Sequence, residues 1–265
     1  MISQEHMASS GPQTSVQPTI RNVGWPDLKD ALAKGYDDFK AMPTHLIFLC
    51  IVYPVVMLVL ARSYAGYDVL PLVFPLLAGY TLIGPLVALG VYELSRRREL
   101  GLDTSRWHSF EVLRSPSIVS IILLGLVLMG VYFGWLAAAQ TIYEMNFSTT
   151  APESVGDFVA EILTTGSGWT LIAVGSSIGF LFAVVVFTLG VISFPMLLDK
   201  DVHLAAAVQT SVRAVAANPM TMGLWAIIIA VSMLLGSLPF FVGLAVVLPV
   251  LGHASWHVYR KVVQY

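Results

Sequence analysis

Residues 115–140 read SPSIVSIILLGLVLMGVYFGWLAAAQ and decide the fold. This stretch contains no Lys, Arg, Asp or Glu. A helix needs about 20 mainly apolar residues to cross the hydrocarbon core of a bilayer. A backbone exposed to lipid must also satisfy its own hydrogen bonds, which a helix does within one segment. The sequence therefore predicts a transmembrane helix over 117–140.

Similar apolar stretches recur along the chain. Charged residues make up only 11% of it, less than half of the roughly 25% typical of soluble domains. We expect an all-α, polytopic membrane protein in which residues 25–265 form one six-span membrane domain. Residues 1–24 are polar and predict a disordered cytoplasmic tail. The six predicted spans are 44–62, 69–94, 117–140, 169–198, 220–236 and 238–259.

The basic residues predict the orientation of these spans. Of the 14 Lys and Arg residues, all but Arg62 fall on one side of the six-span pattern. Short loops rich in Lys and Arg stay in the cytoplasm, which places both termini there. The net charge of −2 favours no nucleic-acid partner, and the single cysteine, Cys50, permits no disulfide within the chain.

Three amphipathic segments precede the predicted helical hairpins. They cover residues 27–41, 105–115 and 201–217, and each ends just before a proline (Pro43, Pro116 and Pro219). Proline disfavours helix in the residue before it and suits the first turn of the next helix. We therefore predict three parallel repeats, each a surface helix at the inner interface followed by two spans.

Apolar residues spaced by three and four predict which face of each surface helix is buried. Asp38 falls on the opposite, polar face of the first helix, and Thr210 on the exposed face of the third. The predicted apolar stripes are Leu28, Leu32, Gly35, Tyr36 and Phe39 on the first; Trp107, Phe110 and Leu113 on the second; and Val202, Ala205, Val208, Val212 and Val215 on the third.

Two histidines form one candidate site. His253 and His257 are four residues apart, so both rings lie on one helical face, a spacing that suits a shared metal ion or a haem edge. No Cys or carboxylate has ligand spacing around them, and interfacial histidines beside Trp256 and Tyr259 are ordinary in membrane proteins. We expect no cofactor.

A substrate path is a second candidate. Gly84, Pro85 and Pro249 interrupt predicted spans, as in transporters whose broken helices mark the binding site. Glu93 is the best candidate for a charge at depth, but Arg96 and Arg97 follow it by three and four residues. A local ion pair at the inner interface is the favoured explanation.

Glycines at four-residue spacing predict close helix packing. Gly130 and Gly134 form one such pair, and Gly175 and Gly179 form the other. Small residues of this kind let two membrane helices approach closely, within one chain or against a partner.

The run SFPMLLDKDV at residues 193–202, followed by Ala207, Ser211, Asn218-Pro219 and Trp225, resembles a bacterial integral membrane family known as domain of unknown function 2189. The resemblance runs from about Trp25 to Lys261 and implies a bacterial inner membrane. Some members carry a cytochrome c oxidase label, but this chain lacks the buried histidines of a haem–copper centre. The family supplies no binding residues to transfer.

Three functions remain open at this point. The leading one is a non-catalytic accessory subunit or assembly factor in the inner membrane, possible partners being a respiratory oxidase, another membrane complex or a second copy of the chain. The alternatives are a transporter or channel for a small neutral solute, and a haem or metal binder. The sequence contains no His-Glu-x-x-His motif and no Gly-rich phosphate loop, and we predict no catalytic residue.

Overall fold

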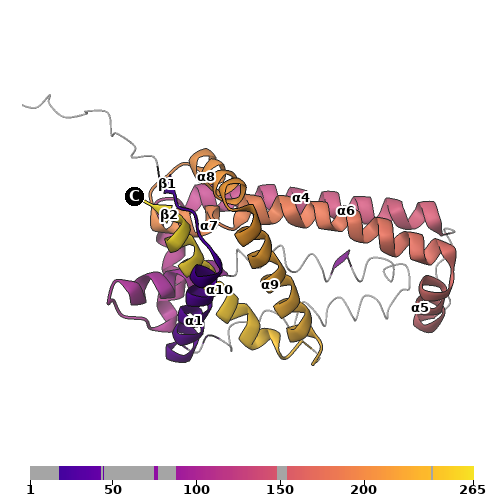
Figure 1. Ribbon diagram of the computed structural model, residues 1–265, viewed down its shortest axis with the longest axis horizontal. Coiled ribbons are helices and arrows are strands. Elements are labelled where there is room, and N and C mark those ends of the chain that lie inside the picture. The colour runs from indigo at the N-terminus through magenta and orange to yellow at the C-terminus, as the bar shows by residue number, and fades with distance from the viewer. Residues whose placement is uncertain (1–17, 43, 45–74, 77–87, 148–153, 240) are drawn as a thin grey trace, which may run out of the picture.

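The computed structural model describes residues 18–42, 44, 75–76, 88–147, 154–239 and 241–265 (Figure 1). Apart from Thr44 and residues 75–76, the predicted span 44–62 and residues 69–87 of the second predicted span lie outside the described part, whereas residues 88–99 form a helical segment. The other described elements are β1 (Thr19–Ile20), α1 (Trp25–Ala41), the 3-10 helix η2 (Arg106–Arg114), α4 (Ile118–Asn146), α5 (Val155–Thr164), α6 (Gly166–Gly190), α7 (Ser193–Asp199), α8 (Leu204–Ala217), α9 (Pro219–Ser237), α10 (Leu244–Val262) and β2 (Val263–Gln264).

The molecule is an all-α membrane protein. Within the described residues, three helical stretches are long and apolar enough to cross a bilayer: Ile118–Asn146, Gly166–Asp199 and Pro219–Ser237. They correspond to the third, fourth and fifth predicted spans. Their exposed side chains are mostly large and apolar, as expected of surfaces that face lipid.

The described helices form two hairpins that begin and end at one side of the molecule. That side consists of α1, residues 88–114, α7, α8 and the C-terminal half of α10, and is called the polar end below. From it α4 leads away and α6 returns, with α5 at the far tip (Figure 1). α9 leads away again, and α10 packs against it on the way back.

The two ends of the described chain meet at the polar end. β1 pairs antiparallel with β2, so that Thr19 lies opposite Gln264 and Ile20 opposite Val263. A chain whose ends lie on the same side of a membrane crosses it an even number of times. This parity agrees with six spans, while the number itself also depends on residues outside the described part.

The prediction of a disordered tail up to Gly24 is wrong for its last residues. Besides pairing in β1, this segment is held by Asn218, whose side chain accepts a hydrogen bond from Val23 N (2.8 Å) and donates one to Arg21 O (3.2 Å). A short polar segment gives no sequence signal for such pairing, because its partners lie about 200 residues away in the chain.

The fourth predicted span is broken where α6 gives way to α7. Ser211, from the adjacent α8, donates a hydrogen bond to Thr188 O (2.6 Å) and accepts one from Ile192 N (3.3 Å). The hydroxyl therefore satisfies backbone groups that the break leaves without helical partners. Ser211 is fully buried as a result.

The buried face of α8 differs from the predicted one. Its buried residues are Ala207, Thr210, Ser211 and Ala214, whereas Val212 of the predicted stripe is 42% exposed. Small residues let α8 lie close to the α6–α7 break, and Thr210 bonds its own helix at Ala206 O. The prediction for Thr210 was therefore wrong, because hydrophobicity alone does not report close approach.

α1 packs against α10 at the centre of the polar end. Its buried residues are Leu28, Ala31, Gly35 and Asp38, while Tyr36 of the predicted stripe is exposed. A Cβ on Gly35 would lie 2.5 Å from Ala254 N, so only glycine permits this crossing. The buried face is thus rotated from the prediction and carries Asp38 inward.

Candidate functional site

Asp38 is the centre of a buried hydrogen-bonded cluster. One carboxylate oxygen, Oδ2, accepts hydrogen bonds from Ser95 Oγ (2.7 Å) and His257 Nε2 (2.9 Å). The other, Oδ1, is paired with the Arg98 guanidinium. Burial would raise the pKa of Asp38, but the hydrogen bonds from His257 and Ser95 outweigh it and hold that pKa below its usual value.

The cluster continues from Ser95 to His253. Ser95 Oγ lies 2.7 Å from both Asp38 Oδ2 and His253 Nδ1. A serine hydroxyl has one proton, and an ionised carboxylate has none to give, so Ser95 donates to Asp38. His253 Nδ1–H must then donate to Ser95. In this arrangement the serine proton is used in the hydrogen bond to Asp38. His253 therefore does not act as a base toward Ser95.

The two histidines of the predicted metal or haem site converge on a carboxylate. His257 bonds Asp38 directly, and His253 Nδ1 lies 3.9 Å from the same oxygen. His253 is fully buried, and its Nε2 has no hydrogen-bond partner among the described residues. In the part of the chain that the structure describes, no group of three or more His, Cys, Asp or Glu side chains could hold a metal ion.

Glu93 forms the local ion pair that its spacing predicted. Its carboxylate accepts two hydrogen bonds from Arg96, at 2.8 and 2.9 Å, and lies 3.9 Å from Arg97. The carboxylate is 3% exposed, so the two-pronged contact with Arg96 compensates for the water it has lost. The ion pair predicted for Glu93 is therefore present in the structure.

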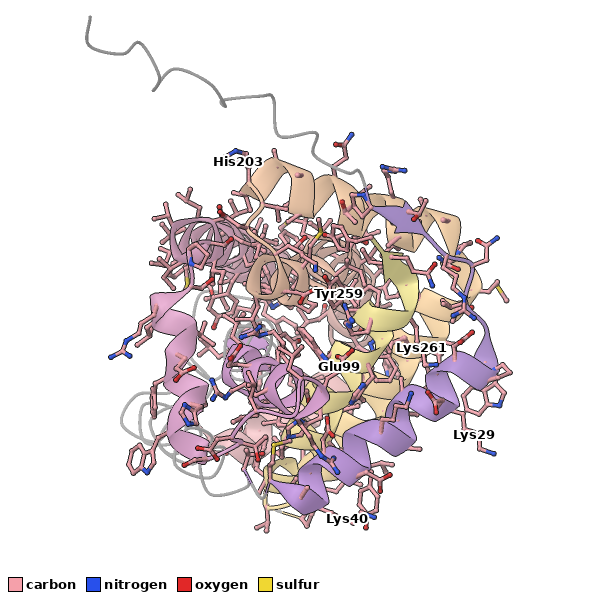
Figure 2. The ribbon with its side chains drawn as sticks, turned by 90° about the vertical axis from the view of Figure 1, so that its left-hand side faces the viewer. Lys29, Lys40, Glu99, His203, Tyr259 and Lys261 are labelled. Carbon is pink, nitrogen blue, oxygen red and sulfur yellow. The ribbon has the colours of Figure 1, made fainter. Side chains whose placement is uncertain are left out.

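Further ion pairs join the polar end across long distances in the chain. Glu99 accepts hydrogen bonds from Trp256 (3.0 Å) and Arg260 (3.0 Å). Lys261 and Lys34 each lie 2.9 Å from Asp30, and their hydrogen bonds, that of Lys261 first, lower the pKa of Asp30 to about 2. Seen end-on, Glu99 and Lys261 lie over α10 within the face, and Lys29 and Lys40 lie at its rim (Figure 2).

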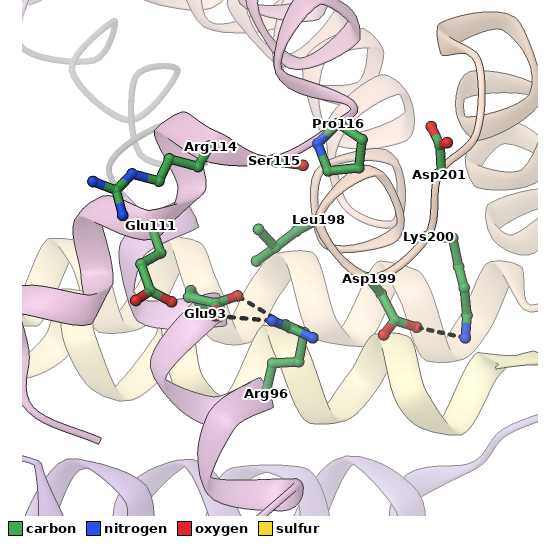
Figure 3. Close-up of a pocket in the computed structure, with 10 residues that line it drawn as sticks. All are labelled: Glu93, Arg96, Glu111, Arg114, Ser115, Pro116, Leu198, Asp199, Lys200 and Asp201. Atoms are coloured by element: carbon green, nitrogen blue, oxygen red, sulfur yellow. Dashed lines mark hydrogen bonds and ion pairs between the residues drawn. The ribbon is translucent and has the colours of Figure 1, made fainter. Parts of the chain in front are cut away.

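The pocket in Figure 3 lies between η2 and the connection from α7 to α8. Its volume is about 360 Å³. Ser115 and Pro116 form one wall, just before α4 begins. Charges of both signs line it: Arg96, Arg114 and Lys200, together with Glu93, Glu111, Asp199 and Asp201.

The glycines predicted to pack between helices divide into two kinds. A Cβ on Gly179 would lie 3.0 Å from the Trp135 ring, and one on Gly134 would lie 3.5 Å from the Phe182 ring. These two glycines lie at the contact between α4 and α6. A Cβ on Gly130 or Gly175 would meet nothing within 4 Å, so these two positions are open.

The predicted substrate path is not assembled among the described residues. Gly84 and Pro85 lie outside them. Pro249 is buried inside α10, and Glu93 is held by Arg96. The path stays a prediction.

Sequence reasoning missed Asp38 and Ser95 as members of one site. Both are short polar side chains among many, and neither is near the other or near His253 in the sequence. One signal was available: Leu28, Ala31, Gly35 and Asp38 follow one another at spacings of three and four. That stripe of small and apolar residues ends in a carboxylate and marks the true buried face.

Apolar helices of spanning length, arranged as hairpins, define the class of this protein as an integral membrane protein of helical type. Residues 73–199 match the model of a family described as predicted integral membrane protein (DUF2189). The family resemblance is thereby confirmed over that segment. No curated protein and no solved structure gives a significant match to the chain.

Proposed function

We propose that this protein is a non-catalytic subunit or assembly factor of the bacterial inner membrane, which holds a partner membrane protein against α4. In this proposal the polar end faces the cytoplasm. All 13 Lys and Arg residues other than Arg62 belong to that end or its connections, and α5 at the far tip carries Asp157 and Glu161 without a basic residue. That distribution is the one expected of an inside-positive protein.

The observation that carries the proposal is an open stripe of small residues on α4. Gly130, Ala137 and Thr141 follow one another at spacings of seven and four, and all are exposed; Gly134 lies between them but at the edge of the contact with α6, where a Cβ would touch the Phe182 ring. The hydroxyl of Thr141 is bonded within the helix to Ala137 O (2.9 Å), so it leaves no polar group without a partner. The stripe therefore has only small side chains, and another helix can pack closely against it.

Small residues favour a protein partner over lipid at this face. In a bilayer, lipid tails are as apolar as the helices, so helices associate through tight packing of backbones. Because glycine has no side chain, a second helix can approach this face of α4 closely. The exposed side chains of Val127 (48%) and Phe133 (59%) flank the stripe on either side and form its walls.

The test is native electrophoresis of tagged protein extracted from its own membranes in mild detergent, with mass spectrometry of each band. We expect the wild type to migrate with a larger complex, and Gly130→Leu to migrate alone. Respiratory oxidase subunits are the first partners to look for, because members of the resembling family carry that label.

A matched control separates partner loss from a general effect of replacing glycine. Gly223, on α9, is also exposed, and a Cβ at this position would likewise meet nothing within 4 Å, so Gly223→Leu makes the same change on another helix. It should keep the large band. A wild type that migrates alone, or equal losses in both variants, contradicts the proposal.

A further inference from the structure

The nine residues of η2 divide among three edges, each with different neighbours. A 3-10 helix has three residues per turn, so side chains three apart line up along its length. One edge contains Ser109 and Val112. Val112 is buried in the core, and a Cβ on Gly90 would lie 3.1 Å from the Ser109 Cβ. This edge therefore attaches η2 to the helical segment at 88–99.

The second edge of η2 is polar and consists of His108, Glu111 and Arg114. Glu111 accepts a hydrogen bond from Arg97 (2.5 Å) and lies 2.6 Å from His108 Nδ1. His108 Nε2 lies 2.9 Å from Asp103. Arg114 ends this edge and is exposed. The polar groups on this side of η2 are thus bonded within the polar end or open to water.

The third edge is apolar and is left uncovered. It consists of Trp107, Phe110 and Leu113, whose side chains are 71%, 59% and 69% exposed. The rings of Trp107 and Phe110 are stacked, with centroids 6.4 Å apart, so they form one continuous apolar surface. The other surface helices differ, because α1 and α8 bury one face each against the protein. Three large exposed side chains on one edge of a single helix indicate an outside contact.

The connection to α4 fixes the depth at which this edge lies. α4 has 29 residues, a length of about 43 Å, which matches the 40–45 Å or so of a bilayer with its head groups. Its start is therefore at head-group level, and exposed Val119 and Ile122 continue from there into the lipid. Only three residues separate Arg114 from Ile118, and these reach at most about 10 Å. η2 is consequently held at the membrane surface.

The direction of η2 agrees with this position. Figure 2 looks along α4 and α6, and η2 is seen from its side at the rim of the polar end. It thus lies across the spanning helices, in the plane that the membrane surface would occupy. Helices in that plane bury their apolar side in lipid, and tryptophan in particular favours the boundary between head groups and acyl chains.

We propose that the edge of Trp107, Phe110 and Leu113 inserts into the lipid leaflet at the polar end and anchors the start of α4 at head-group depth. The occupant of this edge is the lipid of the surrounding membrane, because the short connection to α4 leaves the edge no other apolar phase within reach. The contact is independent of the protein partner proposed for α4, which lies further along that helix.

The experiment measures the surroundings of nitroxide labels on the full-length protein. The native thiol is removed by Cys50→Ser, and Phe110→Cys and Leu113→Cys each carry one label. The protein is reconstituted at one copy per nanodisc of phosphatidylethanolamine and phosphatidylglycerol, so that a second copy cannot cover the edge. Oxygen, which dissolves in lipid, should relax both labels more than a water-soluble nickel complex does. We expect depths of about 5–10 Å in the leaflet.

Arg114→Cys is the matched control, one residue from Leu113 but on the polar edge. Its label should be relaxed more by the nickel complex than by oxygen. Equal preference for nickel at all three positions would mean that the apolar edge faces water. Labels of Phe110→Cys and Leu113→Cys that neither agent reaches would mean that protein covers the edge. Either result overturns the proposal.

A second measurement keeps Cys50 and needs no label. Lipids with bromine in the upper acyl chain quench the emission of tryptophans that contact them. Trp107→Phe should lower the fraction of the emission that bromine quenches, because a tryptophan in contact with lipid is removed. A fraction that stays the same or rises in Trp107→Phe would overturn insertion of this edge. Circular dichroism of each variant shows that it is folded.

Discussion

The polar end and the α4–α6 hairpin are held together in different ways. At the polar end, hydrogen bonds join residues far apart in the sequence: Ser95 with Asp38 across 57 residues, and His257 with Asp38 across 219. On the hairpin, the hydroxyls of Thr141 and Ser177 bond carbonyls only four residues away, and the bond from Trp135 Nε1 to Pro75 O (3.3 Å) is an exception. Local bonds of the second kind form in any helix, whereas the first kind exist only when the whole fold is assembled.

The comparison shows which part of a membrane protein of this type depends most on specific contacts between distant side chains. In lipid, each helix satisfies its own backbone, and little polar chemistry is needed between helices. At the membrane surface, water competes for every polar group, so a buried polar group must find a partner from another element. The polar end is therefore the part in which a single change should have the largest effect.

Removal of the Asp38 charge should have that largest effect. Asp38→Asn keeps the size of the side chain but leaves Arg98 without its counter-charge and disturbs the bonds from Ser95 and His257. The Arg98 side chain is 41% exposed and can turn toward water, but hydrogen bonds to a charged group contribute about 1.5–3 kcal/mol each, so disturbing the buried bonds from Ser95 and His257 should cost about 3 kcal/mol. Unfolding of purified protein in detergent, followed by circular dichroism with increasing denaturant, measures the change.

Asp157→Asn is the matched change at the other end of the molecule. Asp157 interacts with Ser154 at the start of α5, three residues away. We expect a cost of about 1 kcal/mol or less, as for other exposed groups at helix N-termini. Equal costs for the two variants would mean that the two ends do not differ in the way described.

Substitutions at two glycines, one at the polar end and one on the hairpin, test the same difference and should have effects of intermediate size. Gly35→Ala should cost about 2 kcal/mol, because its Cβ would lie 2.5 Å from the backbone of α10 and neither helix can move aside cheaply. Gly130→Ala meets nothing within 4 Å and should be neutral or stabilising by up to about 1 kcal/mol. Thermal melting of both variants in the same detergent measures the two changes in stability. A loss of stability in Gly130→Ala of the isolated protein would contradict an open α4 face.

The smallest expected effect is a dependence on pH in the connection before α4. His108 lies between Glu111 (2.6 Å) and Asp103 (2.9 Å). Hydrogen bonds to Glu111 and Asp103 raise the pKa of His108 above its ordinary value. Hydrogen bonds from His108 correspondingly lower the pKa values of both carboxyl groups.

The sign of the effect follows from linkage. A raised histidine pKa stabilises the folded segment fully below the ordinary value of about 6.5, and this stabilisation is lost as pH rises through the higher, folded value. The lowered carboxyl pKa values stabilise it above about pH 4 and lose that contribution as pH falls. Residues 103–114 should be most ordered near pH 5 to 6.

Hydrogen exchange of residues 103–114 against pH measures this order directly. Order is read as protection, the exchange rate relative to that of an unstructured chain at the same pH, and in His108→Gln the loss of protection between pH 6 and pH 8 should disappear, because glutamine does not titrate. Arg97 also contacts this segment through Asp103 O and Glu111, but it stays charged throughout that range. The same pH dependence in His108→Gln would assign it to another group.

The sequence predicted the membrane class, the described spans and the pair between Glu93 and Arg96. Each depends on apolar length or on a spacing of three or four residues, which are local properties. It did not predict that Asp38 is buried, or that Ser211 satisfies the break between α6 and α7. Each of those features depends on a helix that is distant in the sequence.

By itself the sequence therefore predicted the three spanning stretches that the described residues contain, because hydrophobicity and backbone hydrogen bonding are settled within each helix. It also placed Gly130, Gly134, Gly175 and Gly179 on helix faces. Only the tertiary structure decided that Gly134 and Gly179 are used in the contact of α4 with α6 and that Gly130 and Gly175 remain open. It likewise directed His253 and His257 toward Asp38. The physical reason is that side chains contact one another in three dimensions. The crossing of α1 over α10 determines which residues of the two helices lie close together.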